Sequence, residues 1–168
     1  GTNKIMKASD PVKKDALLTI KGETDAYVSR GAKKLKRAFE VFHLDVQGKT
    51  CMDIGASTGG FTDVLLKNGA KKVFAVDCGI GQLHPSLAND ERVVNLERTN
   101  IRYVTENEIP EPIDFASVDV SFISLKLILP PIVDVLAPGG EIVALIKPQF
   151  EVGKGNAPGG LVRDEKLR

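Results

Sequence analysis

The sequence predicts a doubly wound α/β domain with a mostly parallel sheet. Short apolar segments typical of strands recur from residue 50 onward, segments with helical spacing separate them, and a glycine-rich turn follows the first strand. Strands that alternate with helical crossovers form parallel sheets with helices on both faces. Ligands of such sheets bind at the carboxyl ends of the strands, so these ends are where functional residues are expected.

The elements are expected in the following order. Residues 1–26 are polar and predict a linker or the end of an upstream segment, with one short strand at 16–20. A helix is expected to begin after Ser29, a suitable N-cap residue, because apolar residues between Leu35 and Phe42 recur at helical spacing. Strands are expected at 50–54, 72–76, 92–96, 113–120 and 141–146. Helices are expected from residue 61 to near residue 69 and over 124–136, the second distorted by its two prolines.

Composition narrows the class of protein. The chain has 168 residues, of which 42% are hydrophobic and 27% charged, as in ordinary globular domains. No apolar run reaches the roughly 18–20 residues that a membrane helix needs, and the first residues do not form a signal peptide. The spacing of Cys51 and Cys78 is not that of a metal site, which predicts reduced thiols, no bound metal and a cytoplasmic location.

Charge is spread unevenly along the chain. The net charge is +1, but residues 1–50 carry +5 and residues 51–168 carry −4. A basic first segment on a nearly neutral body indicates an anionic partner. The alternative is a lysine-rich face that is merely solvated.

The first strand ends in a glycine-rich loop, Asp-Ile-Gly-Ala-Ser-Thr-Gly-Gly-Phe at 53–61. Its glycines let a ligand approach the backbone, and the helix that follows points its N-terminus at the site. The spacing Gly-x-x-x-Gly-Gly differs from the Gly-x-Gly-x-x-Gly of dinucleotide binders and favours a ligand without a pyrophosphate. Asp53 is expected to face the positive amino-acid end of a sulfonium ligand. The residues expected to bind the cofactor here are Asp53, Gly55, Ser57, Thr58, Gly59, Gly60 and Phe61.

The second strand ends in Asp77, 22 residues after Gly55. An acid at this place accepts hydrogen bonds from the ribose hydroxyls of an adenosine ligand, although NAD enzymes share the device and Asp77 could simply form a turn before Gly79. Together the two loops predict an S-adenosylmethionine site. Asn100, which follows another strand, is expected to contact this cofactor, with RNA as the alternative.

Asp119 and Lys147 end two further strands. If the strands are neighbours, both side chains meet over the ligand, and Asp119 also contacts it. Methyl transfer to a ribose 2′-hydroxyl needs a base, and a lysine serves as one only when desolvation or a second cation favours loss of its proton. In this interpretation Lys34 of the first helix is the second cation and Asp119 orients both lysines. The alternative is a structural ion pair at the rim of the sheet.

Five segments in chain order, 27–35, 53–62, 76–83, 119–125 and 147–154, carry a resemblance to a known family. They resemble the TlyA/hemolysin A family, which belongs with the FtsJ-like ribose methyltransferases. The resemblance implies a Rossmann-like class I fold, S-adenosylmethionine as the cofactor, and 2′-O-methylation of ribose in ribosomal RNA. It also implies that Lys34, Asp119 and Lys147 match the first three members of a Lys-Asp-Lys-Glu tetrad.

Two departures from the family pattern shape the domain prediction. The family's glutamate lies in a later strand, and neither Glu151 nor Glu165 sits in its motif. The family also begins with a small RNA-binding domain, of which residues 1–26 are expected to be the remnant. We therefore expect a methyltransferase domain over 27–168 that is truncated after its fifth strand.

The sequence also predicts a binding partner and leaves two competing functions open. Ribosomal RNA or ribosomal subunits are the expected partner, bound in part by Arg30, Lys33, Lys36 and Arg37. A membrane-active hemolysin is a competing function, but it needs an amphipathic or apolar membrane segment that the sequence does not show. A module that binds S-adenosylmethionine and RNA without catalysis is the other.

Overall fold

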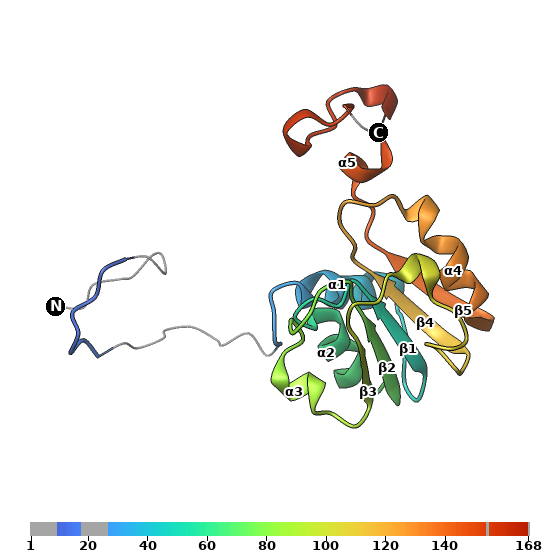
Figure 1. Cartoon of the computed structure of the whole chain (residues 1–168), viewed down its shortest axis with the longest axis horizontal. Helices are drawn as coiled ribbons and strands as arrows, with labels where there is room; N and C mark the ends of the chain where they lie inside the picture. Colours follow the sequence, from blue (N-terminus) through green and yellow to red (C-terminus); the bar gives the residue numbers. More distant parts are fainter. Residues whose placement is uncertain (1–9, 18–26, 154, 168) are drawn as a thin grey trace.

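A computed structural model describes residues 10–17, 27–153 and 155–167. Within them five parallel strands form one sheet in the order β3-β2-β1-β4-β5 (Figure 1). The strands are β1 (Thr50–Ile54), β2 (Lys72–Val76), β3 (Val93–Leu96), β4 (Ile113–Val118) and β5 (Leu136–Ala144). The helices are α1 (Ala32–Phe42), α2 (Gly60–Lys67), α3 (Pro85–Ala88), α4 (Leu129–Asp134) and α5 (Pro148–Glu151). The doubly wound α/β prediction is therefore confirmed.

Four single turns of 3-10 helix complete the list of elements: η1 (Ile101–Tyr103), η2 (Leu125–Leu127), η3 (Pro158–Gly160) and η4 (Glu165–Leu167). The strand order reverses direction between β1 and β4. Because the connections that follow these two strands lead to opposite faces of the sheet, a crevice is expected beside the strand ends, and ligands of such sheets bind there.

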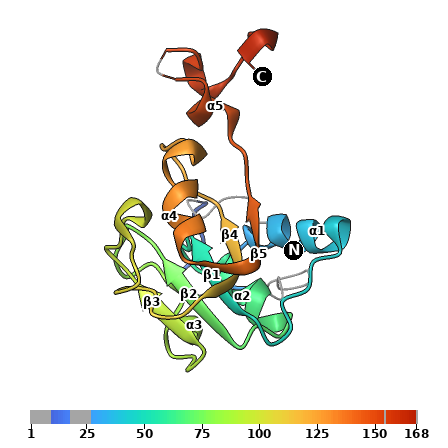
Figure 2. The ribbon, with the colours of Figure 1, turned by 90° about the vertical axis from the view of Figure 1, so that its right-hand side faces the viewer.

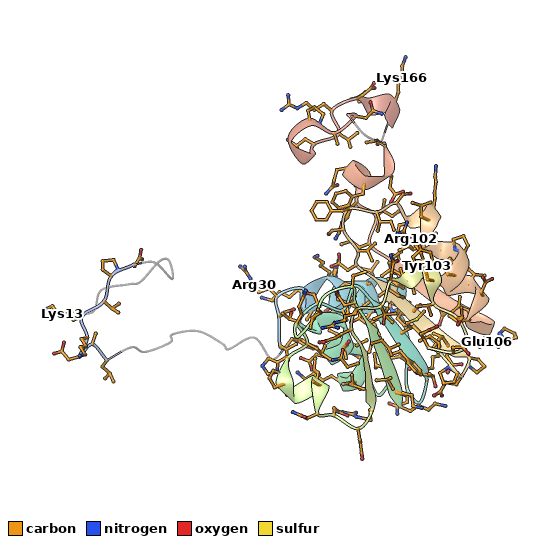
Figure 3. All side chains as sticks on the ribbon, viewed as in Figure 1. Lys13, Arg30, Arg102, Tyr103, Glu106 and Lys166 are labelled. Carbon is orange, nitrogen blue, oxygen red and sulfur yellow. The ribbon has the colours of Figure 1, made fainter. Side chains whose placement is uncertain are left out.

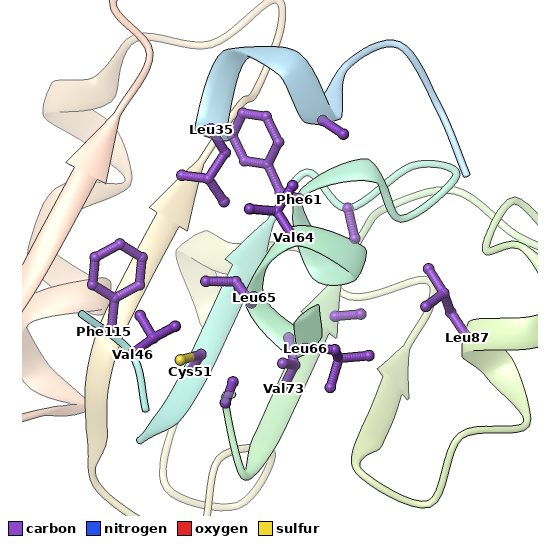
Figure 4. Close-up of a cluster of buried hydrophobic side chains, with 14 of the residues drawn as sticks. Leu35, Val46, Cys51, Phe61, Val64, Leu65, Leu66, Val73, Leu87 and Phe115 are labelled. Carbon is purple, nitrogen blue, oxygen red and sulfur yellow. The ribbon is translucent and has the colours of Figure 1, made fainter. Parts of the chain in front are cut away.

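Both faces of the sheet are covered, which explains why β1 is buried along its whole length. On one face α1 and α2 contribute Leu35, Phe61 and Val64 to a cluster that also holds Phe115 of β4 (Figure 4). On the other face α4 packs its Ile132 into a second cluster. Figure 2 shows α1 and α4 on opposite sides of the sheet. The two clusters fix the strand ends, and with them the functional loops.

The start of α1 differs from the prediction. The helix begins at Ala32, its N-cap residue is Gly31, and no side chain caps it. Ser29 instead forms the preceding turn, in which its carbonyl oxygen accepts a hydrogen bond from the Ala32 amide at 3.3 Å. Its hydroxyl packs over Gly60, where an added Cβ would lie 2.3 Å from the Ser29 Oγ. The side chain of Ser29 therefore packs against α2 and does not cap α1.

Two further elements also differ from the prediction. The helix expected over 124–136 is divided into η2 and α4, because Pro130 and Pro131 have no amide hydrogen and fit only the first turn of a helix. Strand β5 begins earlier than residue 141, and residues 137–140 form an irregularity between the Ile113–Leu136 and Phe115–Glu141 pairs. Most of the expected linker 1–26, including the end of its expected strand, lies outside the described residues.

Candidate active site

A cavity of about 340 Å³ lies at the carboxyl ends of β1, β2 and β4. Five residues predicted to bind a cofactor line it: Gly55, Ser57, Asp77, Asn100 and Asp119. A larger hollow of about 510 Å³ opens beside α2 and α3 and shares no lining residue with the first. We place the site in the smaller cavity, because the strand ends and their charged side chains converge there.

Hydrogen bonds from the backbone hold the carboxylate of Asp77 at this cavity. Its Oδ2 accepts a hydrogen bond from the Ser57 amide at 2.8 Å, and its Oδ1 accepts one from the Gly79 amide at 2.7 Å. Each carboxylate oxygen retains a lone pair for a further donor. Asp77 is therefore a turn residue, and its carboxylate is held at the cavity in an orientation compatible with the predicted role as a hydrogen-bond acceptor for a ligand.

Gly55 is required by the close approach of β1 to the end of β4. Its φ is +82°, and an added Cβ would lie 2.5 Å from the carbonyl oxygen of Asp119. Any other side chain would push the two loops apart and displace Asp119 from the cavity. Gly55 thus allows Asp119 to reach its position at the cavity, and it also leaves space for a ligand.

Thr58, Gly59, Gly60 and Phe61 of the glycine-rich loop do not line this cavity, and their expected cofactor contacts stay a prediction. Phe61 is buried in the core under α1, and an added Cβ on Gly59 would lie 2.3 Å from Leu87 Cδ1. Gly60 faces Ser29 in the same way, and Thr58 accepts a hydrogen bond from the His84 amide through its carbonyl oxygen. These residues pack α2 against its neighbours, because a helix that starts directly after the loop must pass close to them.

Three elements distant in sequence bring Lys34, Asp119 and Lys147 together. The Nζ of Lys34, on α1, lies 2.7 Å from Asp119 Oδ2, and the Nζ of Lys147 lies 2.6 Å from Asp119 Oδ1. The Lys147 ammonium also donates a hydrogen bond to Ser121 Oγ at 2.9 Å. Ser121 lines the cavity and was not predicted, although its position two residues after Asp119 is a usable signal.

Burial and charge act in opposite directions on Asp119. Partial burial raises the pKa of its carboxyl group, but the ammonium groups of Lys147 and Lys34 outweigh burial and hold that pKa below its ordinary value. Asp119 is therefore ionised at neutral pH, with one ammonium on each oxygen. Charged groups arranged in this way at the wall of a cavity can orient a substrate and take part in proton transfer.

Comparison with known proteins identifies the fold and the family. The sequence profile of the FtsJ-like methyltransferase family matches residues 27–168. The chain belongs to this family. The 16S/23S rRNA (cytidine-2′-O)-methyltransferase TlyA of Mycobacterium tuberculosis is 53% identical over 154 residues, which cover 91% of this chain and 58% of that protein. Hemolysin A of Brachyspira hyodysenteriae is 46% identical, with coverage of 99% and 68%.

A solved structure of a protein named as a hemolysin, from Streptococcus thermophilus, matches this chain with a TM-score of 0.82 at 51% sequence identity. The match covers 88% of this chain and 54% of that protein's chain. These matches confirm the resemblance and the class I methyltransferase fold. The chain spans about three fifths of the length of curated relatives such as TlyA.

Membership of the FtsJ-like methyltransferase family implies S-adenosylmethionine as methyl donor. The described residues fit the adenosine part of such a ligand, since the Asp77 carboxylate is already oriented at the cavity and Asn100 lies beside it. No described helix has the length and apolar character to cross a membrane. The described ranges also contain no group of three or more His, Cys, Asp or Glu side chains arranged to hold a metal ion.

Cys78 gives this FtsJ-like protein a built-in probe of the cavity. It is exposed and lines the cavity, whereas Cys51 is buried and burial raises its pKa to about 12. Since a thiolate is the reactive form, a maleimide reagent should label Cys78 and spare Cys51. S-adenosylhomocysteine should slow the labelling in proportion to the fraction of sites filled, as measured by mass spectrometry. If the rate of Cys78 labelling stays constant at saturating S-adenosylhomocysteine, the ligand does not bind in this cavity.

Asp53 does not face the cavity as expected. It is fully buried, and its Oδ2 accepts hydrogen bonds from the amide and hydroxyl of Thr62 at 2.8 and 2.7 Å, while its Oδ1 accepts one from Ser117. Burial raises the pKa of Asp53 to about 6, although the bonds from Thr62 and Ser117 favour the charged form. Asp53 thus ties α2 to β1 and β4 beneath the loop.

The raised pKa of Asp53 predicts a pH dependence of stability. The folded protein holds this proton more tightly than the unfolded chain, so the free energy of unfolding falls as pH rises from about 4 to about 6. The shift corresponds to about 3 kcal/mol. Asp53→Asn keeps the side-chain shape and should remove this fall, as measured by urea unfolding at pH 4, 5, 6 and 7. Parallel pH profiles for the two proteins would show that the pKa of Asp53 is the same in the folded and unfolded states.

Proposed function

We propose that this protein catalyses S-adenosylmethionine-dependent 2′-O-methylation of ribose in ribosomal RNA. The observation that carries the proposal is the convergence of Lys34 and Lys147 on Asp119, which lines the cavity. The names of TlyA from Mycobacterium tuberculosis and from Campylobacter jejuni, both (cytidine-2′-O)-methyltransferases, support it. Action on ribosomal RNA also supports a cytoplasmic location and ribosomal subunits as partners.

Each residue has a distinct role in this proposal. S-adenosylmethionine supplies an electrophilic methyl group when bound. Asp77 would accept hydrogen bonds from its ribose hydroxyls, and Asn100, which lines the same cavity, would contact its adenosine part. Lys147, in its neutral form, takes the proton of the substrate 2′-hydroxyl while that oxygen bonds to the methyl carbon and the carbon–sulfur bond breaks. Asp119 holds Lys147 in place through one carboxylate oxygen, and Lys34 pairs with the other oxygen of the same carboxylate.

Helix α1 supports RNA as the substrate. Arg30, Lys33, Lys36 and Arg37 are exposed on or just before the helix that supplies Lys34, and Arg37 also pairs with Glu40 at 3.2 Å. Figure 3 shows Arg30 extending away from the domain. We propose that these side chains contact phosphates next to the target ribose. Contacts of this kind make RNA affinity fall steeply with salt concentration.

The test is transfer of a tritiated methyl group to naked ribosomal RNA and to separated ribosomal subunits. Digestion to nucleosides should place the label on a 2′-O-methylnucleoside, and a salt series should show steep loss of RNA affinity. Label on a base, or no label with either substrate, would contradict the proposal. Leakage from liposomes, measured in parallel, addresses the hemolysin alternative raised by the Brachyspira relative.

A further inference from the structure

Two segments that follow the neighbouring strands β4 and β5 contact each other beyond the carboxyl ends of these strands. We call residues 119–125 the β4 loop and residues 147–151 the β5 turn. The β5 turn contacts the β4 loop at its start through Lys147, in its middle through the rings of Phe150 and Phe122, whose centroids are 5.2 Å apart, and at its end through Glu151. The ion pair that we propose as catalytic is thus one end of a longer contact.

Glu151 makes the contact at the other end. Its Oε2 accepts a hydrogen bond from the Ser124 hydroxyl at 2.6 Å, and its Oε1 accepts one from the Leu125 amide at 2.9 Å. Ser124 is the N-cap residue of η2 and also accepts a hydrogen bond from the Lys126 amide. Hydrogen bonds to a carboxylate are shorter and stronger than those between neutral groups. Both oxygens of Glu151 are therefore occupied by the β4 loop.

Lys147 and Glu151 are coupled through α5. Lys147 is the N-cap residue of this single helical turn and Glu151 is its last residue. The Phe150 amide closes the turn by donating to the Lys147 carbonyl oxygen at 2.9 Å. Because so short a helix has little stability of its own, its geometry depends on the contacts at its two ends. Release of Glu151 would let the turn open and move Lys147 Nζ relative to Asp119.

We propose that Glu151 is a positioning residue that holds Lys147 against Asp119 through the Ser124–Leu125 end of the β4 loop. The proposal rests on the proposed function, in which Lys147 is the base. Glu151 does not line the cofactor cavity, so its loss should change turnover without changing cofactor affinity. A displacement of about 1 Å at a reacting group costs on the order of 100-fold in rate.

The test compares Glu151→Met, which keeps the length of the side chain and removes both acceptors, with Glu151→Gln, which keeps an acceptor for the Leu125 amide. Glu151→Met should lower kcat about 10- to 100-fold with unchanged KM for S-adenosylmethionine, and Glu151→Gln should recover part of the loss. Ser124→Ala should act in the same direction, and it should not add fully to Glu151→Met if both act through one contact. Glu106→Met, at an exposed loop position (Figure 3), is the matched control.

A second measurement does not depend on activity. Competitive acetylation, read by peptide mass spectrometry, should modify Lys147 slowly in the parent, where its side chain is 19% exposed, and several-fold faster in Glu151→Met. Unchanged acetylation of Lys147, or parent-like kcat in both Glu151 variants, would overturn the positioning role. If the parent protein itself fails to methylate ribose, the proposed function falls, and the acetylation rates still decide whether Glu151 holds Lys147.

Discussion

Lys147→Ala is expected to lower methyl transfer to ribosomal RNA by about 10²- to 10⁴-fold, the usual contribution of a general base. Asp119 and Lys34 would remain in place, but no amine would lie at the end of β5 to accept the proton of the 2′-hydroxyl. Lys147 does not line the cofactor cavity. S-adenosylmethionine affinity, measured by calorimetry, should therefore stay within about threefold of the parent value, a difference of less than 1 kcal/mol.

The matched control is Lys126→Ala, which removes an exposed lysine from η2, close to the same loop. It should leave both turnover and cofactor affinity unchanged. Parent-like turnover in Lys147→Ala would remove the proposed base. A joint loss of turnover and cofactor affinity would instead mean that Lys147 supports the cavity rather than the chemistry.

The sheet could be predicted from the sequence because each strand has a clear local signal. Strands β1 and β2 begin and end at the predicted residues, since both are short apolar runs with turns after them. The region from 124 to 144 was harder. Its prolines and glycines are compatible with a distorted helix, a turn or an irregular strand. Which of these structures forms depends on the pairing of β5 with β4, which local sequence does not reveal.

The candidate site was predicted in part, for a similar reason. Asp77 and Asp119 directly follow β2 and β4, and Lys147 follows β5 by three residues. Parallel strands place such residues at one edge of the sheet whatever the helices do. The glycine-rich loop is different, because a glycine is needed equally for a bound ligand and for a close helix. The positions of Leu87 beside Gly59 and of Ser29 beside Gly60 show a packing requirement that the sequence pattern does not reveal. Glu151 gave no local signal, because its partners lie 26 and 27 residues away in the chain.

Asp119→Asn is expected to affect more properties than Lys147→Ala. The substitution keeps the shape of the side chain, but it leaves the two ammonium groups without a counter-charge and puts an amide donor against one of them. Methyl transfer should fall at least as far as in Lys147→Ala. Cofactor affinity should fall as well, because Asp119 lines the cavity. Tritium transfer and calorimetry on the two variants distinguish a residue that faces both substrates from one that faces RNA alone.

The pH dependence of stability supplies an independent check on Asp119. Its pKa is lower in the folded protein than in the unfolded chain, so its ionisation stabilises the fold above the ordinary pKa of 3.8, and this contribution is lost as pH falls through the lowered value. Asp119→Asn should therefore unfold at lower urea concentration than the parent near neutral pH, and the difference should shrink in acid. Asp134→Asn, at an exposed position at the end of α4, should match the parent at every pH. A constant difference across the whole pH range would mean that Asp119 acts by packing, and the two ammonium groups would then not depend on its charge.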